Sequence, residues 1–123
     1  MVQSYVRELL RGVVEPLLLF LISELPVHGY QIIKELEKRS QGYFKLKEST
    51  IYSALRRMEN DGLVLSSWQQ VAHKQRRRYY ELTDRGRQIL KRELSDWQDF
   101  YTAVSKVLTT ESADKVLWPK IVG

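Results

Sequence analysis

The segment from Glu48 to Gly86 constrains the fold more than any other part of the chain, because its pattern changes from helix to strand within a few residues. From Ser49 to Glu59, four apolar residues recur at helical spacing and share one face: Ile51, Ala54, Leu55 and Met58. The opposite face is small, polar and basic, and consists of Ser49, Tyr52, Ser53 and Arg56. Asn60-Asp61-Gly62 ends this helix, since glycine adopts the left-handed conformation without a Cβ clash. The pattern predicts a short helix with one buried face and one open polar face.

Two strands joined by a basic loop are expected after this helix. They cover residues 64–68 and 76–82, with the loop at 71–75, and Tyr80 is expected in the core. The second strand begins with three consecutive arginines, Arg76 to Arg78. A helix with an open polar face beside such a hairpin suits a DNA duplex, with the helix in the major groove and the hairpin, or wing, against phosphates. The sequence therefore predicts a mainly α fold with a small β-hairpin, namely a winged helix-turn-helix domain.

Positive charge is concentrated in the same region. The whole chain has 20 Lys and Arg against 15 Asp and Glu, a net charge of +5. Residues 71–92 alone hold eight basic residues and two acidic ones, a net charge of +6. From residue 93 to residue 104 the charged residues are all acidic: Glu93, Asp96 and Asp99. A local basic patch of this kind is the electrostatic footprint expected for a polyanionic partner.

Several other classes of protein receive no support from the sequence. The chain has no cysteine, which excludes disulfides and thiolate metal sites. His28 and His73 are its two histidines, and no nucleophile motif, phosphate-binding loop or metal-ligand spacing accompanies them. No signal peptide is apparent, and the longest apolar run, Leu17–Ile22, is far shorter than the roughly 20 residues that span a bilayer. We expect a cytoplasmic protein that is not an enzyme and has no cofactor, metal or membrane partner.

We call the predicted helix at residues 49–59 the recognition helix. The chain before it is expected to form two further helices. Residues 13–25 are apolar nearly all round, which indicates a helix buried on most sides. Pro16 fits the first turn of that helix, so a helix break is expected just before it. One small domain cannot easily bury such a helix alone, and we therefore expect Leu17 and Leu18 at a partner surface. The next helix is expected to open at Pro26 and to run to about Ser40.

The last helix carries the second strong signal. Thr83 is a good N-cap for it. Apolar residues then recur at steps of 4, 3, 4, 3 and 4: Leu90, Leu94, Trp97, Tyr101, Val104 and Leu108. A mean step of 3.5 is the spacing of a coiled-coil seam, and it favours a long C-terminal dimerisation helix over a helix that packs only on its own domain. We expect a DNA-binding domain at 1–82 and a dimerisation helix with a tail at 83–123.

Three runs of sequence together resemble one family of proteins. These runs are Val27–Ile33, Glu48–Leu63 and Arg76–Gly86. In this order they closely resemble the PadR family of transcriptional regulators, over roughly residues 7–108. A single helix after the wing is similar to the family branch that includes multidrug-sensing repressors. The resemblance implies a homodimeric repressor whose first and last helices form the interface. Family members bind an inverted-repeat operator, and some release it when a small aromatic ligand enters.

The resemblance also implies DNA-binding roles on the recognition helix, the wing and the helix before them. The matching positions are Tyr30, Ser49, Thr50, Tyr52, Ser53, Arg56, Lys74, Arg76 and Arg77. Three features depart from the family pattern: Lys47 stands where a Ser or Asn cap is common, Ser53 stands where many members have Pro, and the wing loop lacks the usual glycines. Hydroxyl groups pair with several bases, and an arginine contacts either guanine or phosphate, so these residues do not define an operator sequence.

A ligand site is implied at the dimer interface. Trp97 matches the position at which multidrug-sensing relatives stack planar aromatic compounds. Phe100 and Tyr101 follow one turn later, and Asp96 and Asp99 would attract a cationic compound. The alternative is that Trp97 and Tyr101 only fill the dimer seam, and the sequence leaves both interpretations open.

A winged helix that binds protein instead of DNA is the alternative function. Such modules usually lose the basic wing and fill the recognition face with apolar residues. The arginines at 76–78 and the polar face of the recognition helix favour DNA. Ionic strength separates the two functions, because DNA affinity falls steeply with salt while an apolar protein contact barely responds.

Overall fold

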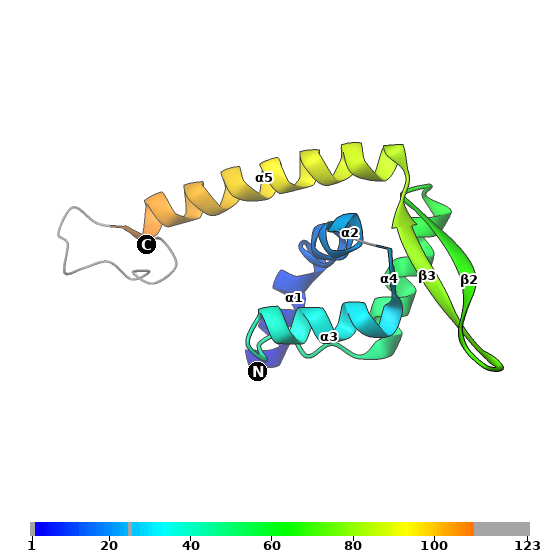
Figure 1. Cartoon of the computed structure of the whole chain (residues 1–123). Coiled ribbons are helices and arrows are strands. Elements are labelled where there is room, and N and C mark those ends of the chain that lie inside the picture. The colour runs from blue at the N-terminus through cyan, green and yellow to red at the C-terminus, as the bar shows by residue number, and fades with distance from the viewer. Residues whose placement is uncertain (1, 25, 110–123) are drawn as a thin grey trace. The chain divides into compact units, whose positions relative to one another are not determined.

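The computed structural model describes residues 2–24 and 26–109, and the tail after Thr109 lies outside the described residues. The elements follow in this order: α1 (Val2–Arg11), α2 (Val14–Glu24), β1 (Val27–His28), α3 (Gly29–Arg39), α4 (Glu48–Asn60), β2 (Val64–Ala72), β3 (Gln75–Leu82) and α5 (Asp84–Leu108) (Figure 1). The chain forms two compact units, Met1–Leu90 and Lys91–Gly123, so α5 has residues in both. The predicted winged helix-turn-helix with a long last helix is confirmed.

Helix α2 supplies much of the core of the first unit. Leu18, Leu19 and Ile22 are at most 2% exposed, as the sequence predicted for a helix that is apolar nearly all round. Pro16 is the third residue of this helix, and it loses no intrahelical hydrogen bond there because the first N–H groups of a helix have no partner. The predicted helix break before Pro16 is also present, since α1 ends at Arg11. Burial of each such side chain stabilises the fold by about 1.5–3 kcal/mol.

Two residues that we expected at a dimer interface belong instead to the core of the first unit. Leu18 is 0% exposed and Leu90 is 8% exposed, and both pack among the other buried apolar residues. A side chain that its own chain buries has no surface left for a partner, so both assignments are wrong. Periodicity shows that a residue is buried but not which surface covers it. Leu17 is only partly buried against this core.

The sheet has a third strand that the sequence did not reveal. Its order is β1-β3-β2, and all neighbours are antiparallel. Val27 pairs with Tyr80 and His28 with Tyr79, where we had expected the start of a helix. Two residues are too few to show the alternation by which strands are recognised, so only pairing with β3 defines β1.

Helix α3 begins at Gly29, three residues after the predicted start at Pro26, and His28 is its N-cap. The backbone N–H of Gln31 donates to Nδ1 of His28 over 3.3 Å, and the backbone N–H of His28 donates to Oε1 of Gln31 over 3.4 Å. This reciprocal pair is a capping box, which satisfies two backbone donors at the start of the helix. The rings of His28 and Tyr79 also form a T-shaped pair, with centroids 5.5 Å apart. His28 therefore fastens the start of α3 to the sheet.

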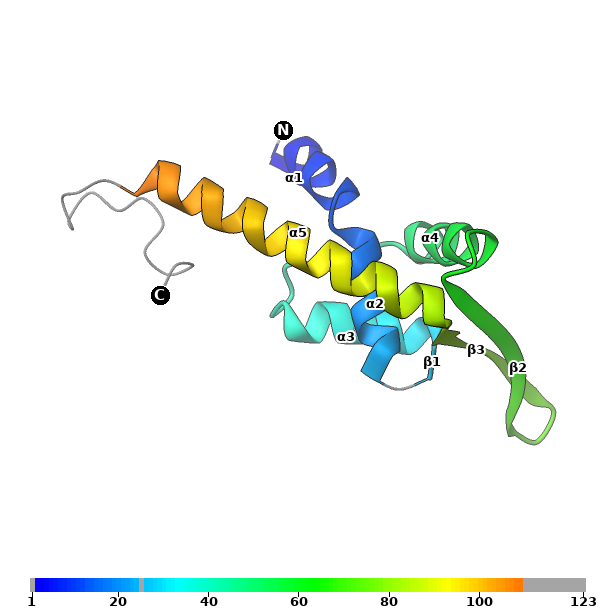
Figure 2. The ribbon, with the colours of Figure 1, turned by 90° about the horizontal axis from the view of Figure 1, so that it is seen from above.

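Strands β2 and β3 form a long hairpin that extends away from the helices of the first unit (Figure 2). We call this hairpin the wing. Its turn consists of His73 and Lys74 alone, because Ala72 still pairs with Gln75, so it is tighter than the predicted loop. Lys74 has a φ of +60°, a left-handed conformation that residues other than glycine adopt mainly in turns. The basic side chain of Lys74 stands exposed at the tip.

The connection from the wing to α5 is closely packed. The predicted N-cap Thr83 is present: its hydroxyl donates to the carbonyl of Gly62 over 2.6 Å and accepts the backbone N–H of Gly86 over 2.9 Å. Gly62 has a φ of +77°, as expected where α4 ends. A Cβ on Gly86 would collide with the carbonyl of Leu63. The first turn of α5 is thereby tied to the end of α4 within the first unit.

Candidate nucleic-acid interface

The two faces of α4 differ sharply in burial. Its inner face is at most 2% exposed and consists of Ile51, Ala54, Leu55 and Met58. Its outer face is exposed and carries the expected contact residues Ser49, Thr50, Tyr52, Ser53 and Arg56. Lys47 is the N-cap and makes no side-chain capping bond, while Glu48 in the first turn complements the helix dipole. The structure therefore presents α4 as a helix anchored by one face and open to a partner on the other.

One arginine of the wing is bound to α4. Nε of Arg78 donates to Oγ of Ser66 over 2.9 Å, and that hydroxyl donates to Oε2 of Glu59 over 2.8 Å. The guanidinium of Arg78 also lies 3.8 Å from the Glu59 carboxylate. Glu59 belongs to α4, so this chain of bonds joins the wing to the recognition helix and offsets one of the wing charges.

An exposed tryptophan lies between two arginines on the wing. The guanidinium carbons of Arg76 and Arg78 lie 5.7 and 5.5 Å from the ring centroid of Trp68, within cation–π range. Trp68 is 56% exposed, so it does not belong to the core. Our sequence analysis did not select Trp68 as a site residue. The strand register was the missing signal, because it sets Trp68 opposite Arg78.

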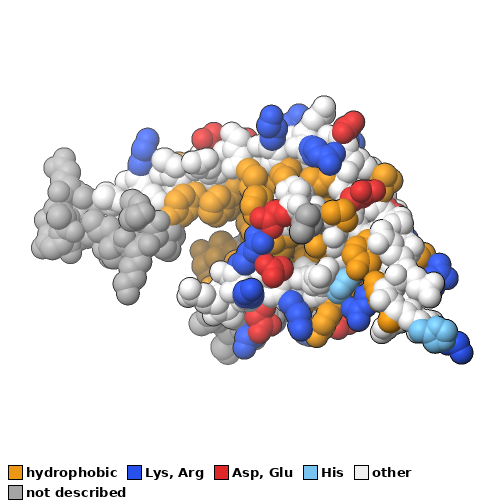
Figure 3. Space-filling view, in the orientation of Figure 1, with side chains coloured by type: hydrophobic (Ala, Val, Ile, Leu, Met, Phe, Trp, Pro, Cys, Tyr) orange, Lys and Arg blue, Asp and Glu red, His pale blue; other side chains and the backbone are white. Residues whose placement is uncertain are grey.

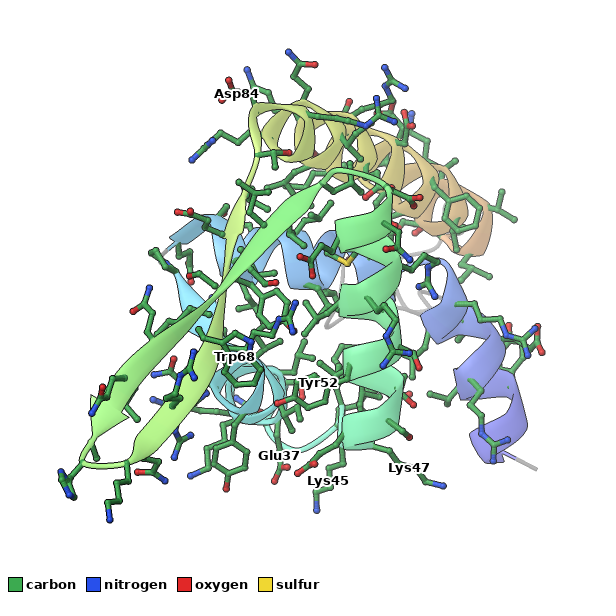
Figure 4. All side chains as sticks on the ribbon, turned by 90° about the vertical axis from the view of Figure 1, so that its right-hand side faces the viewer. Glu37, Lys45, Lys47, Tyr52, Trp68 and Asp84 are labelled. Atoms are coloured by element: carbon green, nitrogen blue, oxygen red, sulfur yellow. The ribbon has the colours of Figure 1, made fainter. Side chains whose placement is uncertain are left out.

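A hollow of about 500 Å³ lies between the wing, the outer face of α4 and the start of α3. Residues of all three elements line it: His28, Gly29, Tyr30, Tyr52, Arg56, Glu59, Trp68, Arg76, Arg77, Arg78 and Tyr80. Trp68 on the wing and Tyr52 on α4 both belong to this lining (Figure 4). Four arginines against one glutamate make its lining strongly basic. We call this feature the basic hollow.

The basic hollow brings together five of the nine residues expected to contact DNA: Tyr30, Tyr52, Arg56, Arg76 and Arg77. Ser49, Thr50 and Ser53 are exposed on α4 but do not line the hollow, and Lys74 is at the wing tip. Figure 3 shows basic side chains along the edge and at the tip of the wing. The expected contact residues therefore share the first unit, spread over the hollow, the rest of α4 and the tip.

Close packing shapes the floor of the hollow. A Cβ on Gly29 would lie 2.5 Å from the ring of Tyr52, so the absence of a side chain lets that ring rest against the start of α3. Burial raises the pKa of the Tyr52 hydroxyl, and the nearby carboxylate of Glu48 adds to the rise. Tyr52 therefore stays neutral at physiological pH and can donate a hydrogen bond. Burial, with a smaller effect of Arg77, lowers the pKa of His28.

The second unit exposes a different kind of surface. On α5, Leu94 is 40% exposed, Trp97 44% and Phe100 69%. The rings of Trp97 and Tyr101 stack with centroids 5.2 Å apart and planes 10° apart. A shallow apolar groove of about 280 Å³ runs along the same helix past Phe100 and Val104. Asp96 is exposed among these residues.

Two other kinds of site find no support among the described residues. No group of three or more His, Cys, Asp or Glu within residues 2–24 and 26–109 could hold a metal ion. In the same part of the chain, no helix is both long and apolar enough to cross a membrane.

The fold and the basic surface together define a winged helix-turn-helix regulator of transcription, a class whose members bind DNA. Comparison with known proteins narrows this class. Residues 18–92 match the model of the transcriptional regulator PadR-like family, and the chain belongs to that family. The family consists of transcriptional regulators and not of enzymes, as the sequence analysis expected.

Solved structures of similar proteins have the same fold. A transcriptional regulator from Clostridium thermocellum is 28% identical, with a TM-score of 0.77 over 83% of this chain and 99% of that one. A PadR family regulator from Eggerthella lenta is 33% identical, with a TM-score of 0.76 over 89% and 94%. PadR of Bacillus subtilis, solved in complex with operator DNA, is 26% identical, with a TM-score of 0.62 over 67% of this chain and 46% of that one.

Proposed function

We propose that this chain binds operator DNA with α4 in the major groove and the wing against the flanking phosphates. The observation that carries this proposal is the joint position of the α4 outer face and the wing arginines around the basic hollow. Hydroxyls and Arg56 on α4 supply groups that read base edges, while Arg76, Arg77 and Lys74 supply charges for phosphates. The operator complex of the Bacillus subtilis relative supports the same proposal.

Salt-dependent binding tests this proposal. Fluorescence anisotropy would follow a labelled duplex from upstream of this protein's own gene, and a scrambled duplex of the same length, at several salt concentrations. We expect tight binding with a clear preference for the upstream duplex. In the Arg76→Ala/Arg77→Ala variant, the slope of log affinity against log salt concentration should become less steep by about 0.9 for each phosphate contact that is lost. Equal, weak affinity for both duplexes would contradict the proposal and favour a winged helix that binds protein.

We infer further that the chain acts as a homodimeric repressor on an inverted repeat. Leu94, Trp97, Tyr101, Val104 and Leu108 keep the coiled-coil spacing, and Leu94 and Trp97 are each at least 40% exposed within the single chain. An exposed apolar stripe of this kind is stabilised by a second copy. A two-fold dimer would meet two half-sites about one helical turn apart. Binding over a promoter would then block transcription. Deletion of this protein should therefore increase the expression of a reporter gene placed behind that promoter.

A planar aromatic ligand is the effector that the second unit suits best. Trp97 and Tyr101 already stack, Phe100 is 69% exposed, and Asp96 supplies a negative charge nearby. Such a ligand releases DNA only if it binds the DNA-competent arrangement of the dimer less well than another arrangement. Titration of the protein–DNA complex with a planar cationic dye should lower the anisotropy of the labelled duplex. If the dye binds and DNA affinity does not fall, the proposed release is contradicted, and Trp97 and Tyr101 only fill the dimer seam.

A further inference from the structure

We propose that Trp68 is a positioning residue for DNA binding, which acts by holding the guanidinium of Arg76 at the basic hollow. This inference rests on the proposed function, because it concerns how the same surface meets a duplex. It adds an uncharged side chain to the residues that were expected to take part in DNA binding.

The register of the wing brings the three side chains together. Trp68 on β2 lies opposite Arg78 on β3, and Arg76 points to the same side as Arg78 because alternate residues of a strand share a face. Both guanidinium carbons lie within 6 Å of the indole centroid. Guanidinium groups stack on aromatic rings through their planar, weakly hydrated surface. One indole therefore orders two long basic side chains.

The two arginines are nevertheless unequal. Arg78 is already bonded to Ser66 and lies beside the carboxylate of Glu59. Arg76 has no carboxylate within ion-pair distance among residues 2–24 and 26–109, and its guanidinium lies over the indole of Trp68. Arg78 therefore braces the wing against α4, while the charge of Arg76 is available for a phosphate.

The exposure of Trp68 indicates that core packing does not explain its position. At 56% exposure the indole sits at the surface of the wing, where its neighbours are basic and aromatic side chains of the hollow. A free arginine side chain loses much rotational freedom when it binds a phosphate, and this loss weakens binding. An arginine already stacked on a rigid indole has less freedom to lose. Removal of the indole should therefore weaken the phosphate contact of Arg76 although it removes no charge.

Salt dependence provides the test, because a neutral residue alters it only by acting through a charged one. Anisotropy would compare the wild type with Trp68→Ala, Arg76→Ala and the double variant on one duplex over a range of salt. Arg76→Ala should reduce the salt slope by about 0.9. Trp68→Ala should reduce it by a large part of that amount and lower affinity about two- to fivefold at low salt. The double variant should be little weaker than Arg76→Ala alone.

Matched variants separate this role from a general loss of structure. Trp68→Phe keeps an aromatic face and should restore most of the slope. Leu65→Ala removes a side chain of equal exposure, 56%, from the other face of the same strand and should leave binding unchanged. A salt slope of wild-type size in Trp68→Ala would overturn the inference, even if this variant melts at a lower temperature. Effects of Trp68→Ala and Arg76→Ala that simply add in the double variant would overturn it as well. A wild type that binds no duplex at any salt would instead overturn the proposed function, and this inference with it.

Discussion

The outer face of α4 and the later half of α5 are both exposed, yet their chemistry is opposite. Around the basic hollow, two exposed rings have cations beside them: Trp68 lies beside Arg76 and Arg78, and Tyr30 lies beside Lys34. On α5 the exposed rings neighbour other apolar side chains. Water solvates the first surface well, and it solvates the second poorly. The contrast shows that the surface of α4 and the wing suits reversible binding of a polyanion, whereas the surface of α5 suits a permanent apolar partner.

The largest effect should follow from charges placed in the apolar surface of α5. Leu94→Asp/Trp97→Asp should convert a dimer to a monomer, because two buried carboxylates would face their own copies across the seam. Loss of the second half-site should lower operator affinity by about 10²- to 10⁴-fold. Light scattering after gel filtration would give the mass, and anisotropy the affinity. Thr102→Asp, an exposed change away from the seam, is the control. A wild type with the mass of a single chain would contradict the assignment of this surface.

A smaller effect should follow from the loss of one cation at the basic hollow. Arg56→Ala removes a charge from the outer face of α4 and should weaken operator binding by about 1–3 kcal/mol, roughly five- to 150-fold. Arg87→Ala is the matched control, because it removes the same charge from an exposed residue that does not line the hollow. Equal losses in the two variants would mean that net charge, and not the position of the charge, governs binding.

Displacement of a single ring should have a milder effect. In Gly29→Ala the new methyl group would meet the ring of Tyr52, which must turn away from the start of α3. We expect DNA affinity to fall a few-fold and stability to fall by about 1–3 kcal/mol. Gly12→Ala, where the nearest atom is 3.9 Å away, should change neither. Thermal unfolding and anisotropy would measure both quantities, and unchanged affinity in Gly29→Ala would remove Tyr52 from the contact surface.

The smallest effect concerns pH. The folded state lowers the pKa of His28 from 6.5, chiefly by burial and then by the charge of Arg77. A lowered pKa means that this contribution to stability is present above 6.5 and is lost as pH falls through the pKa of the folded state. We therefore expect the melting temperature to drop slightly as the solution is acidified. His28→Asn keeps an N-cap that does not titrate and should flatten this part of the profile. A steeper drop in His28→Asn would contradict the assignment.

Most of the fold could be predicted from the sequence, because it depends on local patterns. The helical spacing of Ile51 and Met58 marked the inner face of α4, and Thr83 and Gly62 marked where elements begin and end. What the sequence concealed depends on pairing between distant residues. Strand β1 exists only through its register with β3, and Leu18 proved to be covered by its own chain.

The candidate site divides in the same way. The exposed face of α4 and the basic run were visible as patterns, since both depend on neighbouring residues. The unequal roles of Arg76 and Arg78 were not, because they depend on Ser66 and Glu59, which come from another strand and from α4. Trp68 was missed because an isolated tryptophan in a strand most often packs in the core, and only the register with β3 sets it opposite Arg78.

Hydroxyl-radical footprinting on the duplex upstream of this protein's own gene tests the central claim most directly, since it engages both surfaces in one measurement. The account predicts two protected patches of inverted symmetry, about one helical turn apart, each with a major-groove centre and a flank that the wing covers. In Leu94→Asp/Trp97→Asp the two patches should weaken together. A single protected patch, or protection that shows no sequence preference, would contradict the account of a dimer that reads DNA with α4 and the wing.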